Sequence, residues 1–150
     1  MKQLHRTVFF FMALLTGSLF VPQASARDTL HDWNAQEALQ QGLQTGAILN
    51  NVKVYFAGQE HPGIEKTMGE FRTNRKTNAF NKSDKDACQW AFFSAIKSLQ
   101  ERALSEGGNA VIDIKSNYKN QEFVSATEFQ CGAGAFVAGV ALKGTMVKLK

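Results

Sequence analysis

Cys88 and Cys131 are the most reactive side chains in the sequence, which holds no other cysteine. Two such residues can form a structural disulfide, remain as buried free thiols, or act as a redox-active pair. A redox-active pair normally stands as Cys-x-x-Cys, and these two are far apart in the sequence. We expect a structural disulfide, because paired cysteines of exported chains are usually oxidised and the start of this chain predicts export.

Other residues that could perform catalysis or hold a metal are sparse. His31 and His61 stand apart from each other and from both cysteines, whereas zinc ligands usually cluster at short spacings. The sequence has no Gly-Lys-Ser or Gly-Lys-Thr, so it lacks the phosphate-binding loop of ATPases. The glycine-rich run from Gly132 to Gly139 fits close packing within a sheet. We therefore predict no enzymatic activity, no cofactor and no metal ligands.

A group of basic residues lies within one polar stretch of the sequence. Charge runs of this kind are usually solvated loops, but they can also bind anionic partners. We expect an exposed loop that binds an anionic component of the cell envelope or an envelope protein, with Phe71 and Phe80 adding apolar contact. Nucleic acid is not an expected partner of an exported chain. The predicted binding surface comprises Arg72, Arg75, Lys76, Lys82 and Lys85.

The first 26 residues have the pattern of a secretory signal peptide. Lys2 and Arg6 precede the apolar run "VFFFMALLTGSLFV", which Pro22 ends. The small residues "ASA" follow, so we predict cleavage between Ala26 and Arg27. The apolar run is short for a membrane span. The sequence therefore predicts a soluble periplasmic or secreted protein without a transmembrane anchor.

Hydrophobic patterns in residues 27–150 predict one domain and its elements. A short helix is expected over residues 29–44, and strands are expected over 51–58 and around 68–73. The longest helix is expected over 84–105, with Ser83 as its cap and Asp86 completing a pattern like a capping box. The glycine pair Gly107-Gly108 ends it.

The long helix has an apolar stripe that would cover a sheet. Four of its residues are expected to face water, namely Lys97, Gln100, Glu101 and Arg102. The stripe consists of Cys88, Phe92, Ala95, Ile96, Leu99 and Ala103, broadened by Trp90, Ala91 and Phe93.

Further strands are expected over 109–119 and 122–131, with a hairpin turn near 120, and the chain continues through the small residues of 132–144 to a closing segment over 145–150. The predicted fold class is α+β: an antiparallel sheet of about four to five strands, one long helix packed across it, and a short N-terminal helix. Cys88 at the start of the long helix would then be tied to Cys131 in the sheet.

Residues 69–150 resemble the YbjQ-like domain family, whose members are often labelled heavy-metal-binding domains. The resemblance rests on "GEF" at 69–71, "GGNAV" at 107–111 and "GTMV" at 144–147. RcsF-like envelope lipoproteins are similar in layout but carry a lipidation cysteine and more disulfides. The mature chain also resembles exported bacterial proteins of unknown role, some of them labelled excinuclease ATPase subunits. These resemblances imply a small α+β fold and a homo-oligomer in some members.

Together these features predict a non-catalytic binding or interaction protein of the cell envelope. The RcsF-like layout implies a stress-related role as one form of that function. The alternative function is metal buffering or sensing, which the label of the YbjQ-like family suggests.

Overall fold

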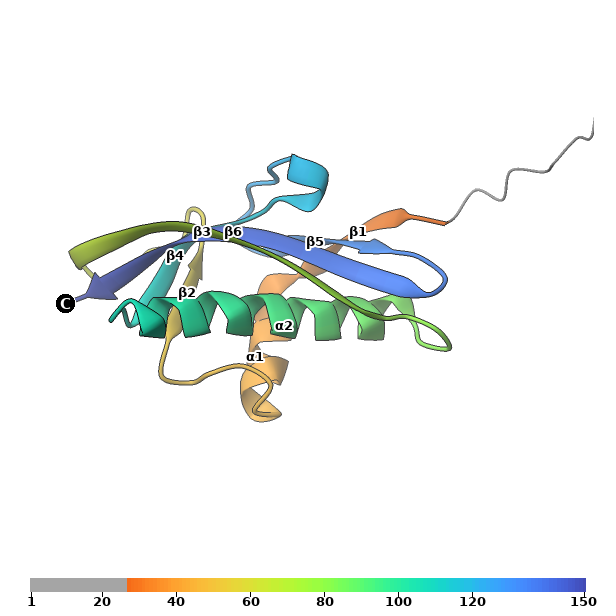
Figure 1. The fold of residues 1–150 in the computed structure, drawn as a ribbon, viewed down its shortest axis with the longest axis horizontal. Coiled ribbons are helices and arrows are strands. Elements are labelled where there is room, and N and C mark those ends of the chain that lie inside the picture. Colours follow the sequence, from red (N-terminus) through yellow and green to blue (C-terminus); the bar gives the residue numbers. More distant parts are fainter. Residues whose placement is uncertain (1–26) are drawn as a thin grey trace, which may run out of the picture.

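The structure, a computed structural model, describes residues 27–150 (Figure 1). The predicted signal peptide, residues 1–26, lies outside the described residues. The described part is a mixed α+β fold, a curled sheet with a long helix across one face and a shorter helix beside it. Its elements are β1 (Thr29–Asn34), α1 (Ala35–Gln44), β2 (Lys53–Phe56), β3 (Ile64–Asn78), α2 (Asp84–Ser105), β4 (Ala110–Ser116), the 3-10 helix η1 (Tyr118–Asn120), β5 (Glu128–Ala133) and β6 (Val137–Leu149).

The sheet has six strands, more than the four or five predicted. Strand β6 is central: β3 pairs along one side of it, while β5 and then β4 pair along the other. Strands β1 and β2 extend this second side, beyond β5 and β4 respectively. The predicted antiparallel pairing is wrong for one pair, because β2 runs parallel to β4. This pair is parallel because the chain crosses over through β3 and α2 between the two strands.

The helix predicted over residues 29–44 begins later, because its first residues form β1 and pair with β5. In β1 the side chains of His31 and Trp33 are half-buried while their neighbours are exposed. That two-residue period is typical of a strand. The helix α1 follows, capped by Asn34, whose side-chain oxygen accepts a 2.8 Å hydrogen bond from the Glu37 backbone N–H.

The strand predicted over 122–131 is also shorter than expected. A turn forms near the predicted position, but the returning chain pairs with β4 only between Phe123 and Ser116. Strands β2 and β6 already occupy the two sides of β4. Residues 122–127 therefore cross the sheet as an irregular segment, and β5 forms its hairpin with β6 instead.

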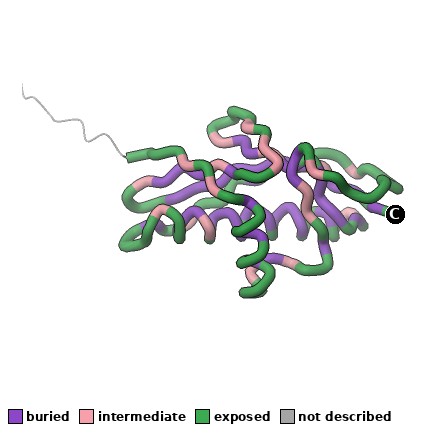
Figure 2. The backbone as a smooth tube through the Cα atoms, turned by 180° about the vertical axis from the view of Figure 1, so that it is seen from behind, coloured by how far each residue is buried: buried purple, intermediate pink, exposed green. Residues whose placement is uncertain are grey.

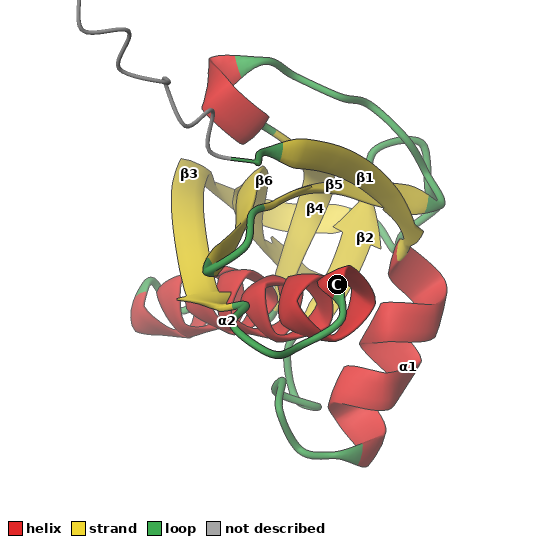
Figure 3. Cartoon of the chain, turned by 90° about the vertical axis from the view of Figure 1, so that its right-hand side faces the viewer, coloured by secondary structure: helices red, strands yellow, loops and turns green. Residues whose placement is uncertain are grey.

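Helix α2 covers one face of the sheet, and η1 lies over the opposite face, which we call the outer face (Figure 3). The predicted cap is confirmed, since the Ser83 hydroxyl accepts a 3.1 Å hydrogen bond from the Asp86 backbone N–H. Gly107 follows the helix with φ of 80°, the left-handed conformation expected at this position. The six residues of the predicted apolar stripe are all fully buried, and buried residues recur along α2 and the central strands (Figure 2).

Two predictions for α2 are wrong. The Trp90 side chain is 53% exposed and does not broaden the buried stripe. Gln100 does not face water but is buried at 1% exposure. Its side-chain amide bonds the backbone N–H and C=O of Leu49 at 2.8 and 2.7 Å and the C=O of Val52 at 2.8 Å. Gln100 is buried because it supplies hydrogen-bond partners to the irregular segment between α1 and β2.

The predicted disulfide between Cys88 and Cys131 is confirmed, with a Cα–Cα distance of 5.8 Å. It ties the start of α2 to β5, and both residues are fully buried. Next to it, the Phe92 ring stacks on Phe129 of β5 with centroids 4.0 Å apart. The disulfide and the stacked rings together hold the helix against the sheet.

Candidate functional site

The five basic residues predicted as a binding surface do not form one loop. Arg72, Arg75 and Lys76 lie on β3, which continues well beyond the strand expected around 68–73. Lys82 lies in the following turn, and Lys85 is on α2. The strand continues because its whole length pairs with β6, most of which is buried. The polar sequence of β3 therefore marks an edge strand and not a loop.

Alternation along β3 sends its basic side chains to opposite faces of the sheet. Arg75 faces α2, where its Nη2 donates a 2.7 Å hydrogen bond to the Ser98 hydroxyl. Arg72 and Lys76 lie on the outer face with Asn74 between them. Successive residues on this face of a strand are about 7 Å apart. Three polar side chains thus form a regular row on the outer face.

The other two basic residues do not join this row. Lys85 pairs with Glu37 of α1, with 2.9 Å between Nζ and Oε1. Lys82 donates a 2.9 Å hydrogen bond from Nζ to the backbone oxygen of Asn78. The structure therefore brings together Arg72 and Lys76, and it separates the remaining three residues of the predicted surface from them.

A groove of about 700 Å³ runs along the outer face beside this row. Its floor includes Gly132 of β5 and Gly139 of β6, which pair with each other and carry no side chains. Asn74 and Lys76 line one wall, and η1 overhangs the other. Ligand sites in proteins usually have volumes of about 300–1,000 Å³. The end of the groove at the β5–β6 turn is apolar and is lined by Ala135, Phe136 and Val137.

A second hollow of about 210 Å³ continues the groove and shares Asn74 and Lys119 with it. Arg72 lines this hollow, opposite Asn117 and Asn120. The combined site is polar and basic at one end and apolar at the other. We call the two hollows together the outer-face groove.

The wall formed by η1 is held in place by Asp28. The Tyr118 hydroxyl donates a 2.8 Å hydrogen bond to one carboxylate oxygen of Asp28, and Lys119 forms an ion pair with the other. Hydrogen bonds from Lys119 and then Tyr118 lower the pKa of Asp28. Burial, followed by the hydrogen bond with Asp28, raises the pKa of Tyr118 to about 12. At neutral pH the wall therefore carries a carboxylate paired with a cation and an un-ionised phenol.

The charge of the outer-face groove is positive because its one carboxylate is already neutralised. None of the ion pairs within residues 27–150 includes Lys76, and Arg72 makes only an exposed pair with Glu70, with 3.3 Å between Nε and Oε1. Exposed pairs of this kind contribute little and leave the cation available. The arrangement can bind an anion beside an apolar group.

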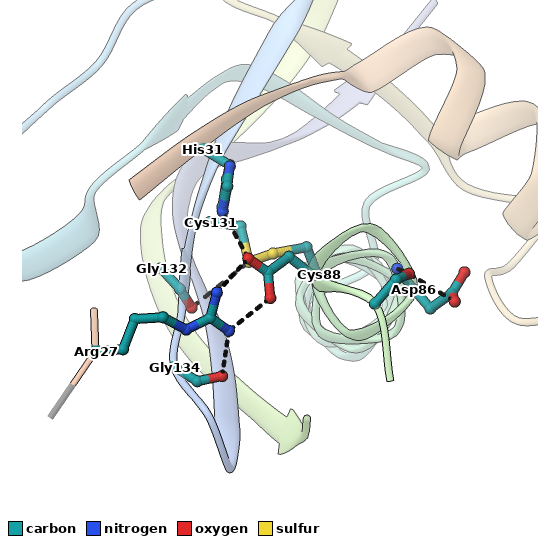
Figure 4. A network of polar contacts seen from close by, with 9 residues as sticks. Arg27, His31, Asp86, Cys88, Cys131, Gly132 and Gly134 are labelled. Carbon is teal, nitrogen blue, oxygen red and sulfur yellow. Dashed lines mark hydrogen bonds and ion pairs between the residues drawn. A yellow bond between two sulfur atoms is a disulfide. The ribbon is translucent and has the colours of Figure 1, made fainter. Parts of the chain in front are cut away.

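A second polar network lies at the start of β1, above the disulfide (Figure 4). Arg27 donates two hydrogen bonds to the Asp84 carboxylate, at 2.9 and 2.7 Å, and one to the backbone oxygen of Gly134 at 3.0 Å. The His31 Nε2 lies 2.9 Å from Asp84 Oδ2. The hydrogen bonds from Arg27, with a further one from His31, lower the pKa of Asp84. This network joins β1 to the first residue of α2.

The pair formed by His31 and Asp84 has the geometry of a base and its orienting carboxylate, but a nucleophile is needed for catalysis. None of the hydrogen bonds in the described part of the chain joins His31 to a hydroxyl or a thiol, and the neighbouring Cys131 is in the disulfide. His61 bonds only the Pro62 backbone oxygen. The network is therefore best explained as a structural connection.

No group of three or more His, Cys, Asp or Glu side chains within residues 27–150 is arranged to hold a metal ion. None of the helices in this same range combines the length and the apolar composition needed to cross a membrane. The disulfide agrees with an extracytoplasmic location.

Sequence reasoning missed most of the outer-face groove, including the polar residues Asp28, Asn74, Tyr118 and Lys119 and the apolar residues Phe136 and Val137. Asn74 could have been found by extending the predicted strand, because every second residue of a strand lies on the same face, and Asn74 lies between Arg72 and Lys76 in this series. Tyr118 and Lys119 lie in the polar run "SNYKNQ", which carries only a turn signal. The sequence gives no sign that Asp28, 90 residues away from Tyr118, is its partner.

Comparisons of the chain with protein-family models, with curated proteins and with solved structures find no match. The resemblance to the YbjQ-like family and what it implies therefore stay predictions.

Proposed function

We propose that this protein is an exported, non-catalytic binding protein of the cell envelope, periplasmic or secreted. Its ligand is an anionic amphiphile of the envelope, a molecule with a phosphate or carboxylate head and an apolar tail. The observation that carries the proposal is the outer-face groove, which has unneutralised basic side chains at one end and an apolar lining at the other.

The charges support an anionic head group. Lys76 and Arg72 stand on one wall, whereas Lys119 on the other wall is already paired with Asp28. A basic side chain on the first wall can bind a phosphate through charge-assisted hydrogen bonds, which are stronger than neutral ones.

The apolar end supports a tail. Phe136 and Val137 line the groove and are 66% and 50% exposed, so they offer apolar surface that a bound chain would cover. Gly139 carries no side chain, so a thin extended molecule can lie close to the sheet at this position, beside the Tyr118 ring that covers Gly132.

The test uses decyl phosphate, kept below the concentration at which it forms micelles, and follows backbone amide shifts by NMR. We expect shifts at Asn74, Gly139 and Val137, and about tenfold weaker binding for Lys76→Glu, because the substitution replaces attraction by repulsion. Lys53→Glu is the matched control, since Lys53 is an exposed lysine on β2 that lines neither hollow of the groove. Equal binding by the wild type and Lys76→Glu, or equal weakening by both variants, would contradict the proposal.

A further inference from the structure

Three exposed apolar side chains gather at the end of the β5–β6 hairpin. Phe80 is 55% exposed, Phe136 is 66% exposed and Val137 is 50% exposed. The rings of Phe80 and Phe136 stack with centroids 5.7 Å apart and an angle of 9° between their planes. We call these three residues the aromatic tip. Because large aromatic side chains are costly to leave in water, a stacked and exposed pair indicates a surface that is covered in use.

The aromatic tip is held by the backbone and is not a loose loop end. The Ala79 N–H donates a 2.8 Å hydrogen bond to the Phe136 backbone oxygen, which joins the turn after β3 to the β5–β6 turn. The Gly134 N–H bonds the Val137 backbone oxygen at 2.8 Å and closes the hairpin. The two rings are therefore presented together from two connected turns.

Basic residues surround the aromatic tip. Lys82 is exposed in the same turn as Phe80, and Lys76 lines the groove that also contains Phe136. Two carboxylates lie at the nearby start of α2: Asp84 is bound by Arg27, and Asp86 accepts a hydrogen bond from the Ser83 hydroxyl. The tip therefore presents apolar rings with basic side chains around them. Such a tip is complementary to a surface that has an anionic outer layer over an apolar interior.

The start of the described chain lies at this same end of the molecule (Figure 1). The Arg27 side chain bonds the Gly134 backbone oxygen, so it touches the hairpin that carries the tip. The residues before Arg27 include the apolar run of the predicted signal peptide. The aromatic tip therefore lies at the end of the described structure where the predicted signal peptide is attached.

We infer that the aromatic tip docks on an anionic lipid bilayer, with Phe80 and Phe136 entering the headgroup region while Lys82 and Lys76 contact lipid phosphates. A few aromatic side chains combined with basic residues give reversible interfacial binding that depends on anionic lipid. This inference goes beyond the proposed function, because it concerns a bilayer surface and not a single bound molecule, and because Phe80 does not line the outer-face groove.

The experiment measures co-sedimentation of the processed exported protein with vesicles. One set of vesicles is pure phosphatidylcholine, and the other is an equal mixture of phosphatidylcholine and phosphatidylglycerol. We expect binding to the mixed vesicles that weakens with added salt, and about tenfold weaker binding for Phe80→Ser and for Phe136→Ser. Phe80→Trp should keep the binding and should show a blue-shifted emission when vesicles are added.

Val124→Ser is the matched control, because Val124 is 61% exposed on the irregular segment before β5. The two proposals fail separately: Phe80→Ser should weaken vesicle binding about tenfold and keep decyl phosphate binding. Vesicle binding that is the same for wild type and Phe80→Ser would overturn the inference. So would sedimentation velocity showing a wild-type dimer that Phe80→Ser converts to a monomer, because the tip would then be covered by a second copy of the chain.

Discussion

The Tyr118 side chain lies directly on Gly132, with no room between them for even one methyl group. A Cβ atom built on Gly132 would lie 1.9 Å from the Tyr118 hydroxyl oxygen and 2.1 Å from its ring carbon Cζ. The glycine is therefore required by the wall of the groove, since Tyr118 reaches Asp28 only across this position.

Gly132→Ala should displace Tyr118, lower the free energy of unfolding by about 1–3 kcal/mol and weaken decyl phosphate binding. Gly139→Ala is the control, because its Cβ would meet the Lys76 side chain at an ordinary 3.5 Å. Urea denaturation of both variants measures the difference. In a Tyr118→Ala background, Gly132→Ala should lower the free energy of unfolding much less. An undiminished loss of stability in that background would show that the clash with Tyr118 is not the cause of the destabilisation.

Gln100→Leu should destabilise the fold by at least about 2 kcal/mol, since it leaves buried backbone groups of Leu49 and Val52 without partners. The neighbouring Glu101→Leu, at an exposed position, should change the free energy of unfolding by less than about 0.5 kcal/mol. Thermal or urea unfolding compares the two. Similar effects of both variants would show that the hydrogen bonds of the buried Gln100 amide do not stabilise the fold.

Removal of the disulfide by the double change Cys88→Ala and Cys131→Ala should lower the free energy of unfolding by about 4 kcal/mol, the chain-entropy value for a loop closed across a separation of 43 residues. The measurement is guanidinium denaturation with and without a reductant. The reductant should destabilise the wild type and leave the double variant unchanged. A wild type insensitive to reductant even when unfolded would indicate that the bond is not formed.

Acid should destabilise the protein partly through Asp84. Hydrogen bonds from Arg27 place its folded-state pKa below its unfolded value, which is about 3.9. The stabilising contribution of the Asp84 carboxylate is therefore present above about pH 4 and is lost as the pH falls through its folded-state pKa. Asp84→Asn should reduce the loss of stability between neutral and acidic pH in urea titrations.

Arg27→Gln tests the same interaction from the other side, because it removes the main cause of the lowered pKa. It should reduce the acid sensitivity as Asp84→Asn does, and the double variant should show little further change. An unchanged pH dependence in either single variant would contradict the assignment.

The elements with strong local patterns were predictable from the sequence. Helix α2 has a capping serine, an apolar stripe and a terminating glycine, and each local signal agrees with the tertiary packing. Gln100 was assigned wrongly because the helix pattern alone does not reveal the irregular segment between α1 and β2 that uses its amide. Trp90 was assigned wrongly because, two residues after Cys88, it lies nearly opposite the apolar stripe on the helix and is exposed.

The candidate site was predictable only in part. Arg72 and Lys76 share the outer face, but their apparent loop is a strand whose partner, β6, lies about seventy residues further along the chain. Asp28 and Tyr118 come together only through the fold. A charge pattern indicates which side chains are exposed to solvent. The pairing of β3 with β6 decides which of these side chains lie on the same face of the sheet.

The long strand β3 has one further consequence. It hydrogen-bonds to β6 along one side, and no other strand among residues 27–150 pairs with it. Open strand edges are templates for fibril growth, and charged side chains are a common protection against it. Arg72 and Lys76 therefore serve also as gatekeepers, and replacing them by leucine would invite aggregation that could be mistaken for lost ligand affinity.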